Sequence, residues 1–150
     1  MKKVLFLSVA ILLFAACEGP AGRDGFDGTE TYWFVNTYTV NSNQWQLVNG
    51  VDELESYYKA SITVSELDRD MYEKGNVFCY MFQRVNNVEV QTPLPFTVPR
   101  GVWIDGSEYL WTETFAFDFS LRTITFYVNY SDFLTINRPE TTSFRVVLNY

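Results

Sequence analysis

The chain of 150 residues contains no histidine. Histidine is the commonest general base near neutral pH and the commonest ligand of transition metals in proteins. A serine or cysteine nucleophile would therefore need a lysine or a terminal amine as its base. Beyond residue 16 the only lysines are Lys59 and Lys74, and neither lies in a recognisable motif. We therefore expect a protein that is not an enzyme and that holds no cofactor and no metal ion.

Basic side chains are also few. The chain has 11 Lys and Arg against 18 Asp and Glu, which gives a formal net charge of −7. Loss of residues 1–16 would remove Lys2 and Lys3 as well and leave 9 basic against 18 acidic side chains, a net charge of −9. Nucleic acids and anionic lipid surfaces attract basic surfaces. We expect no nucleic-acid partner and no charge-driven docking on lipid.

The first sixteen residues have the layout of a secretory signal peptide. Met1, Lys2 and Lys3 form a short positive region, and residues 4–14 are an apolar run that only Ser8 interrupts. An apolar run of this length is too short to span a hydrocarbon layer of roughly 30 Å as a helix. The sequence therefore predicts a leader over residues 1–16 and export from the cytoplasm.

Ala15, Ala16 and Cys17 resemble the lipobox of bacterial lipoproteins, with Phe14 in place of the commonest leucine. The resemblance implies cleavage after Ala16 and a diacylglyceryl thioether on Cys17. Acyl chains contribute about 0.8 kcal/mol per buried methylene, so several chains make a durable anchor. We predict an outer-membrane lipoprotein attached through Cys17. Its domain lies either on the periplasmic side of that membrane or at the cell surface, and both alternatives stay open. The alternative is ordinary secretion with Cys17 as a free thiol.

A short collagen-like segment follows. Gly19, Gly22, Gly25 and Gly28 keep glycine at every third position, as a triple helix requires. Three triplets with a single proline are too few to hold a trimer, so residues 17–28 are interpreted as an extended spacer. At about 3.1 Å per residue in polyproline II, these residues could span on the order of 35 Å. A trimerising stub is the alternative.

From residue 29 onward the apolar pattern has a period of two. Phe115, Phe117 and Phe119 share one face, and residues 124–130 and 144–150 alternate in the same way. Such alternation is typical of half-buried antiparallel strands. The strands predicted elsewhere cover residues 32–40, 44–48, 57–64, 77–85 and 88–92.

The breaks between these strands carry recognisable signals. Asn86 and Asn87 predict a two-residue hairpin turn, and Pro93 and Pro95 then end the ladder. Residues 65–75 predict a short helix, with Ser65 as its N-cap and a glycine as its left-handed stop. Residues 99–106 are interpreted as a loop. Cys79 is expected to be a small buried hydrophobe, with no disulfide because Cys17 carries lipid.

These elements predict an all-β domain over residues 29–150, an antiparallel β-sandwich with immunoglobulin-like layers, about eight strands and one short helix. A barrel is the second choice. The sequence also resembles a group of small Bacteroidetes lipoproteins with a few Gly-X-Y triplets and a compact β domain. The resemblance implies location and fold, and it supplies no site residue beyond Cys17. The short sequence segments on which this resemblance rests are residues 17–20, 62–67, 75–80, 93–96 and 144–147.

Aromatic residues give the one indication of function. Four tryptophans and ten tyrosines exceed the usual needs of a small sandwich. Exposed rings bind sugars or act as interface hot spots, although most rings are expected in the core. Trp103 and Trp45 are the candidate ligand contacts, with Trp103 placed in the loop at 99–106.

We therefore predict a non-enzymatic binding, structural or adhesion module, whose partner is a glycan or an envelope protein. The first alternative is a carbohydrate-binding module that uses exposed Trp and Tyr side chains. The second is a small hydrolase with two paired acids, because such an enzyme needs only two carboxylates about 5–10 Å apart. No pair stands out among the eighteen acids, and residues 52–55 and 105–108 are interpreted as loop acids.

Overall fold

A computed structural model describes residues 32–150. The predicted leader, Cys17 and the Gly-X-Y spacer lie outside the described residues. The domain is one compact unit with its own hydrophobic core. Between residues 32 and 150, no helix is both long and apolar enough to cross a membrane.

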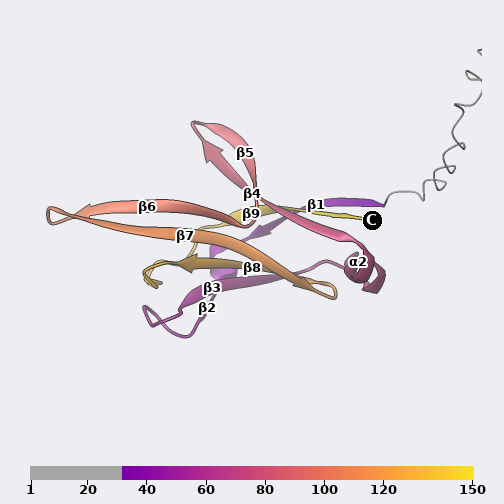
Figure 1. Cartoon of the computed structure of the whole chain (residues 1–150), viewed down its shortest axis with the longest axis horizontal. Coiled ribbons are helices and arrows are strands. Elements are labelled where there is room, and N and C mark those ends of the chain that lie inside the picture. The colour runs from indigo at the N-terminus through magenta and orange to yellow at the C-terminus, as the bar shows by residue number, and fades with distance from the viewer. Residues whose placement is uncertain (1–31) are drawn as a thin grey trace, which may run out of the picture. The chain divides into compact units, whose positions relative to one another are not determined.

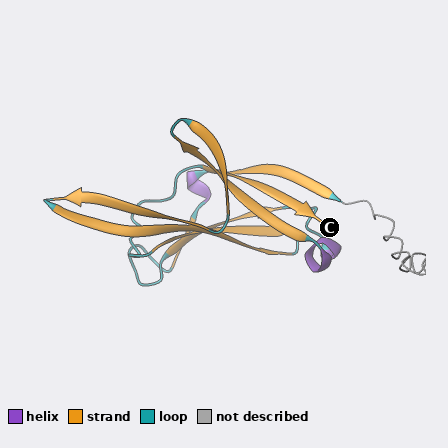
Figure 2. Cartoon of the chain, turned by 45° about the horizontal axis from the view of Figure 1, so that its top comes forward, coloured by secondary structure: helices purple, strands orange, loops and turns teal. Residues whose placement is uncertain are grey.

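Two antiparallel sheets pack as a sandwich, which confirms the predicted fold class (Figure 1). Strand is by far the dominant regular structure (Figure 2). The four-stranded sheet has the order β1 (Trp33–Val40), β9 (Thr142–Asn149), β4 (Asn76–Val85), β5 (Val88–Pro93). The five-stranded sheet has the order β2 (Gln46–Val48), β3 (Tyr57–Thr63), β8 (Thr123–Tyr130), β7 (Ser107–Ser120), β6 (Phe96–Ile104). A 3₁₀ turn, η1 (Ser42–Gln44), lies between β1 and β2.

The period-two pattern places one row of each strand in the core. Alternate residues of β8 and β9 are fully buried, among them Phe126 of β8 and Phe144 of β9. Their rings stack at 3.8 Å between centroids with an interplanar angle of 10°, and this contact joins the two sheets. Aromatic pairs of this kind contribute about 0.5–1.5 kcal/mol beyond the area they bury.

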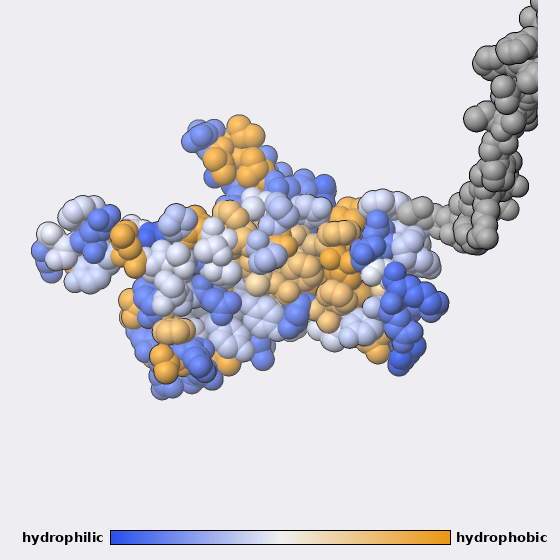
Figure 3. Space-filling model, viewed as in Figure 1, coloured by the Kyte–Doolittle hydropathy of each residue, from blue (hydrophilic) through white to orange (hydrophobic). Residues whose placement is uncertain are grey.

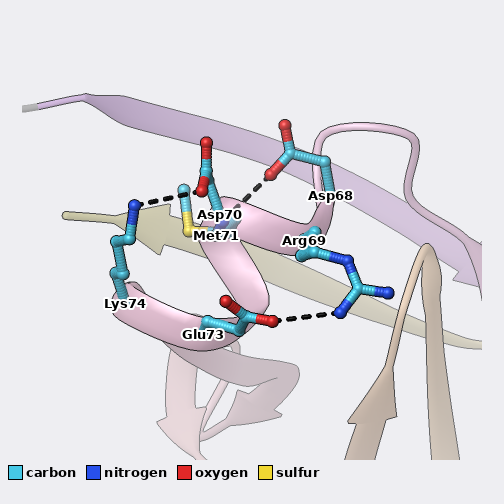
Figure 4. A network of polar contacts seen from close by, with 6 residues as sticks. All are labelled: Asp68, Arg69, Asp70, Met71, Glu73 and Lys74. Atoms are coloured by element: carbon cyan, nitrogen blue, oxygen red, sulfur yellow. Dashed lines mark hydrogen bonds and ion pairs between the residues drawn. The ribbon is translucent and has the colours of Figure 1, made fainter.

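The helix begins later than the sequence predicts. Helix α2 covers Arg69–Lys74, and its N-cap is Asp68, whose Oδ1 accepts the Met71 N–H at 2.9 Å (Figure 4). Ser65 is therefore not the cap, and its hydroxyl donates to Glu66 instead. The preceding residues are held outside the helix because the backbone N–H of Val64 donates to Arg122 O and the N–H of Arg122 donates to Leu67 O.

Gly75 ends α2, but the predicted left-handed stop is wrong, because its φ is −89°. The position needs glycine for lack of space. A Cβ there would lie 2.7 Å from the carbonyl oxygen of Met71 and would also overlap the Met71 sulfur. Met71 itself is buried in the core.

The hairpin turn at Asn86 and Asn87 is confirmed. Both residues have positive φ, 51° and 64°, and they join β4 to β5 with Val85 opposite Val88. Positive φ at both central positions is the requirement of a type I′ turn. β5 ends at Pro93, as expected from the missing N–H of proline.

The loop predicted at residues 99–106 is wrong. Residues 99–104 belong to β6, and a two-residue turn at Asp105 and Gly106, with φ of 50° and 79°, joins β6 to β7. Pro99 and Gly101 are tolerated because β6 is an edge strand, so one side of its backbone has no ladder to complete. The domain has nine strands instead of about eight.

Candidate functional site

An open groove of about 1260 Å³ lies between the two sheets, at the end of the domain where they diverge. Its walls come from β4, from the β6–β7 hairpin and from the connection between β8 and β9. The lining residues are Met81–Arg84, Arg100, Val102, Ile104, Tyr109–Trp111, Glu113, Phe115, Tyr130, Asp132, Leu134 and residues 136–143.

The groove exists because the strands differ in length. β7 pairs with β8 only from Glu113 to Ser120, whereas its pairing with β6 continues to the turn at Asp105. Residues 99–112 therefore form a two-stranded ribbon that projects beyond the sandwich (Figure 1). We call these residues the β6–β7 ribbon. The β4–β5 hairpin projects in the same manner, because β9 pairs with β4 only as far as Met81.

The side of the β6–β7 ribbon that faces the groove continues the row of core residues. Phe115 of that row is buried, with 8% of its surface exposed. Further along the ribbon, Val102, Ile104 and Tyr109 are 41%, 49% and 54% exposed, since no opposing sheet covers them. Figure 3 shows the β4–β5 hairpin and the ribbon standing apart, with apolar residues on both. The groove is thus an extension of the sandwich interior that no side chains of residues 32–150 fill.

A polar group occupies the inner end of the groove. Nε and Nη2 of Arg100 both lie 2.8 Å from Oε2 of Glu113, whose side chain is only 14% exposed. Half-buried Tyr130 adjoins this pair. Burial, with a smaller contribution from the charge of Glu113, raises the pKa of Tyr130. Tyr130 also belongs to the lining of the groove.

The wall opposite the ribbon is fixed by Thr135. This residue is fully buried, while its neighbours Leu134 and Ile136 are 55% and 71% exposed. The Tyr58 hydroxyl donates to the carbonyl oxygen of Thr135 at 2.6 Å. The Thr135 N–H donates to Oδ1 of Asp52 at 2.6 Å, and the Asp52 N–H donates to Oγ1 of Thr135 at 2.9 Å. These bonds hold an apolar pair of side chains at the rim of the groove.

Of the two candidate tryptophans, one is buried and the other is exposed. Trp45 is 1% exposed, packs edge-on against Phe144, and donates its Nε1–H to the carbonyl oxygen of Glu140 at 3.2 Å. The prediction that Trp45 contacts a ligand is therefore wrong, because its ring belongs to the core. Trp103 is 71% exposed and remains a candidate contact. It lies opposite Glu108, on the face of the β6–β7 ribbon that is turned away from the groove.

The sequence interpretation missed the groove residues of the ribbon, among them Trp111 and Tyr109. The signal that could have found them is the Asp-Gly pair at 105–106, flanked by apolar residues on both sides. Asp-Gly between such runs is a strong hairpin signal. It would have turned the expected loop into two strands and placed these side chains on one face.

Three acidic side chains line the groove. Of the acids that line it, Glu113 is held by Arg100, and Asp132 and Glu140 lie on the β8–β9 connection. Within the described domain, no group of three or more Cys, Asp and Glu side chains is arranged to hold a metal ion. Cys79 is buried as predicted, and burial raises the pKa of its thiol to about 12, so it is not a nucleophile.

A second apolar surface is the outer face of the four-stranded sheet. Trp33, Val35 and Phe78 are 61%, 53% and 46% exposed there. The register places Val35 and Phe78 on either side of Val147 of β9, so these side chains form one flat patch. No family model, no curated protein and no solved structure matches the chain.

Proposed function

We propose that this chain is a non-enzymatic binding module of the cell envelope, anchored by lipid on Cys17, whose groove holds the ligand. The groove is the observation that carries the proposal. It combines exposed apolar walls with a polar group at one end, which is the usual composition of a ligand site. Its volume exceeds the range of roughly 300–1,000 Å³ typical of small-molecule pockets, which favours an extended ligand.

The position of the first described residues supports the anchor. Tyr32 stacks on Tyr150 with ring centroids 5.7 Å apart, and the β6–β7 ribbon projects from the opposite end of the domain (Figure 1). The first described residue therefore lies at the end of the domain remote from the groove.

A carbohydrate-binding module remains the first alternative. Trp103 and Tyr109 are exposed aromatic side chains of the kind that stack on sugars. They lie on opposite faces of the ribbon, however, so they do not form a single aromatic platform. A hydrolase with paired acids is the second alternative, and the Arg100–Glu113 ion pair counts against Glu113 as its acid.

Metabolic labelling with palmitate tests the anchor. We expect label on the wild-type chain and none on Cys17→Ser, because the thioether needs the cysteine sulfur. Label that survives the substitution would refute the anchor.

A glycan array tests the carbohydrate alternative with the domain of residues 32–150. A signal that is lost in Trp103→Ala or Tyr109→Ala would favour sugar. The absence of a signal on every glycan would remove that alternative and leave the module with a protein partner.

A further inference from the structure

We propose that the groove takes an extended segment of a partner polypeptide, which adds as a strand to the free edge of β7. This inference deepens the proposed function, on which it rests, by naming the class of ligand. Strand addition uses main-chain hydrogen bonds for affinity and alternate side chains for specificity.

The lining of the groove shows which strand edge is open. Successive side chains of a strand point to opposite faces, so a wall made of alternate residues shows a face and a wall made of consecutive residues shows an edge. β6 contributes the alternate residues Arg100, Val102 and Ile104, whereas β7 contributes the consecutive residues 109–111. The groove therefore meets the inner face of β6 and the backbone edge of β7.

The turn determines which backbone groups point out of that edge. Positive φ at both Asp105 and Gly106 makes a type I′ turn, in which Ile104 and Ser107 exchange both hydrogen bonds. Bonding alternates along an antiparallel pair, so the N–H and C=O of Glu108, Leu110 and Thr112 point away from β6.

Among residues 32–150, partners for these outward groups are found for the last of the three residues only. Thr112 N–H donates to Oγ of Ser131 at 2.8 Å, and Thr112 C=O accepts the Ser131 N–H at 3.0 Å. The pairing of β7 with β8 ends at Glu113, so within residues 32–150 no strand pairs with the edge of β7 that faces away from β6 at Glu108 and Leu110. An added strand would take the place that a longer β8 would have filled.

The side chains around this edge favour a polypeptide over a sugar. The two most exposed apolar side chains of the groove are aliphatic, Ile136 at 71% and Leu134 at 55%. Aliphatic walls leave sugar hydroxyls without partners, and burying an unpaired hydroxyl costs free energy. Apolar side chains of an added strand would cover the same walls. β4 also turns an edge to the groove, and beyond its pairing with β9 it presents Phe82 followed by polar Gln83 and Arg84.

The charged side chains around the groove favour a bound polypeptide segment that carries no net charge. Residues 32–150 hold eight basic and fourteen acidic side chains. Three of each line the groove, which leaves five basic and eleven acidic ones elsewhere. The groove is thus neutral inside an acidic domain, and an uncharged apolar segment is its electrostatic complement. The groove residues are Arg84, Arg100 and Arg138 with Glu113, Asp132 and Glu140.

The far edge of the same ribbon is protected. Pro99 lies opposite Thr112, at a position whose backbone points away from β7, and proline offers no N–H there. Proline on an edge strand is a common device against unwanted pairing. β7 has no proline between Ser107 and Trp111, so the groove side is the edge that the ribbon leaves available.

The test uses the domain of residues 32–150, which is compact and has its own core. A phage-displayed library of random linear heptapeptides is panned on the immobilised domain, and an enriched peptide is synthesised for affinity measurement. Two matched variants follow, Leu110→Pro and Gly101→Pro. The two residues face each other in a pair that is not hydrogen-bonded, so each substitution removes one outward N–H and spares the ribbon's own ladder.

We expect enriched peptides with apolar residues at alternate positions. Leu110→Pro should weaken binding at least tenfold, while Gly101→Pro should stay within about twofold of wild type. Methylation of a backbone nitrogen removes an N–H donor from the peptide. It should abolish binding when it falls on the alternate residues that bond to β7, and it should leave binding intact when it falls on the residues between them. Hydrogen exchange at the amides of Glu108 and Leu110 should slow when the peptide binds.

Four results would overturn the inference. One is a library without enriched peptides. Another is peptide binding that a folded Leu110→Pro variant retains in full. The third is a domain that sediments as a dimer and becomes monomeric in Leu110→Pro, which would assign the edge to a second copy. A glycan that binds wild type and Leu110→Pro alike, but not Ile104→Glu, would also overturn strand addition while leaving the binding function intact.

Discussion

Replacement of Thr135 by valine tests whether the wall of the groove is held as described. Thr135 is fully buried, and its Oγ1 accepts the N–H of Asp52 at 2.9 Å and lies 3.4 Å from the carbonyl oxygen of Gly50. Valine has nearly the same volume, so the change opens no cavity. It leaves the Asp52 N–H without its acceptor, while the backbone bonds of residue 135 to Asp52 and Tyr58 remain.

The magnitude follows from the orphaned amide. The bond is part-buried and Asp52 itself is exposed, so water can reach the freed amide and the loss is that of an ordinary hydrogen bond, about 1 kcal/mol. For a domain of this size, 1 kcal/mol corresponds to roughly 4 °C in the melting temperature, so we expect Thr135→Val to melt roughly 4 °C below wild type. Circular dichroism of the domain during heating measures the shift. Hydrogen exchange at Leu134 and Ile136 should accelerate, since the bonds that hold this wall are weaker.

Thr63→Val is the matched control, because Thr63 is exposed at the end of β3. Its free energy of unfolding should stay within about 0.5 kcal/mol of wild type. If Thr135→Val melted at the wild-type temperature, the side-chain bond would contribute nothing. The rigidity of the wall would then have to come from the backbone bonds alone.

Two further predictions concern titratable groups. Cys79 is 2% exposed with its thiol pKa raised to about 12 by burial, so a thiol reagent at pH 8 should label the domain only after denaturant unfolds it. Native labelling as fast as labelling in denaturant would contradict the burial. The hydrogen bond to Asp118 and burial raise the pKa of Tyr127 from 10.0 to about 12. The stability that this proton gives is complete below pH 10 and is lost as the pH rises towards 12. Denaturant unfolding at pH 9 and pH 11.5 should therefore show a larger loss for wild type than for Tyr127→Phe, and equal losses would refute the assignment.

The regular part of the fold is predictable because one face of each strand is buried. The alternation in β7, β8 and β9 gave the strands and their core rows, and the turn at Asn86 and Asn87 depends on local backbone preference alone. The helix start is different. Ser65 has an acid three residues on, a pattern typical of N-caps, but tertiary hydrogen bonds through Arg122 hold the residues before Asp68 in a turn.

The candidate site was harder to predict, since it depends on the relative lengths of neighbouring strands. Pro99 and Gly101 indicate a loop by themselves, and they fit a strand only because β6 lies at a sheet edge. Trp45 could not be placed from its own neighbourhood, because Phe144 and the carbonyl of Glu140, both distant in sequence, decide its burial. Val102 and Ile104 have the alternation of core residues, and only the missing opposite sheet makes them part of a groove.

The pairing of β1 has a mechanical consequence. The chain enters the domain through Trp33, and all eight residues of β1 pair with β9 in an unbroken antiparallel register. If the N-terminus is tethered and a partner grips the opposite end, tension runs along β1 and across its hydrogen bonds. The ladder is then loaded in shear, so its bonds resist together instead of opening one after another from an end. A module built in this way is suited to holding its partner under a steady pull.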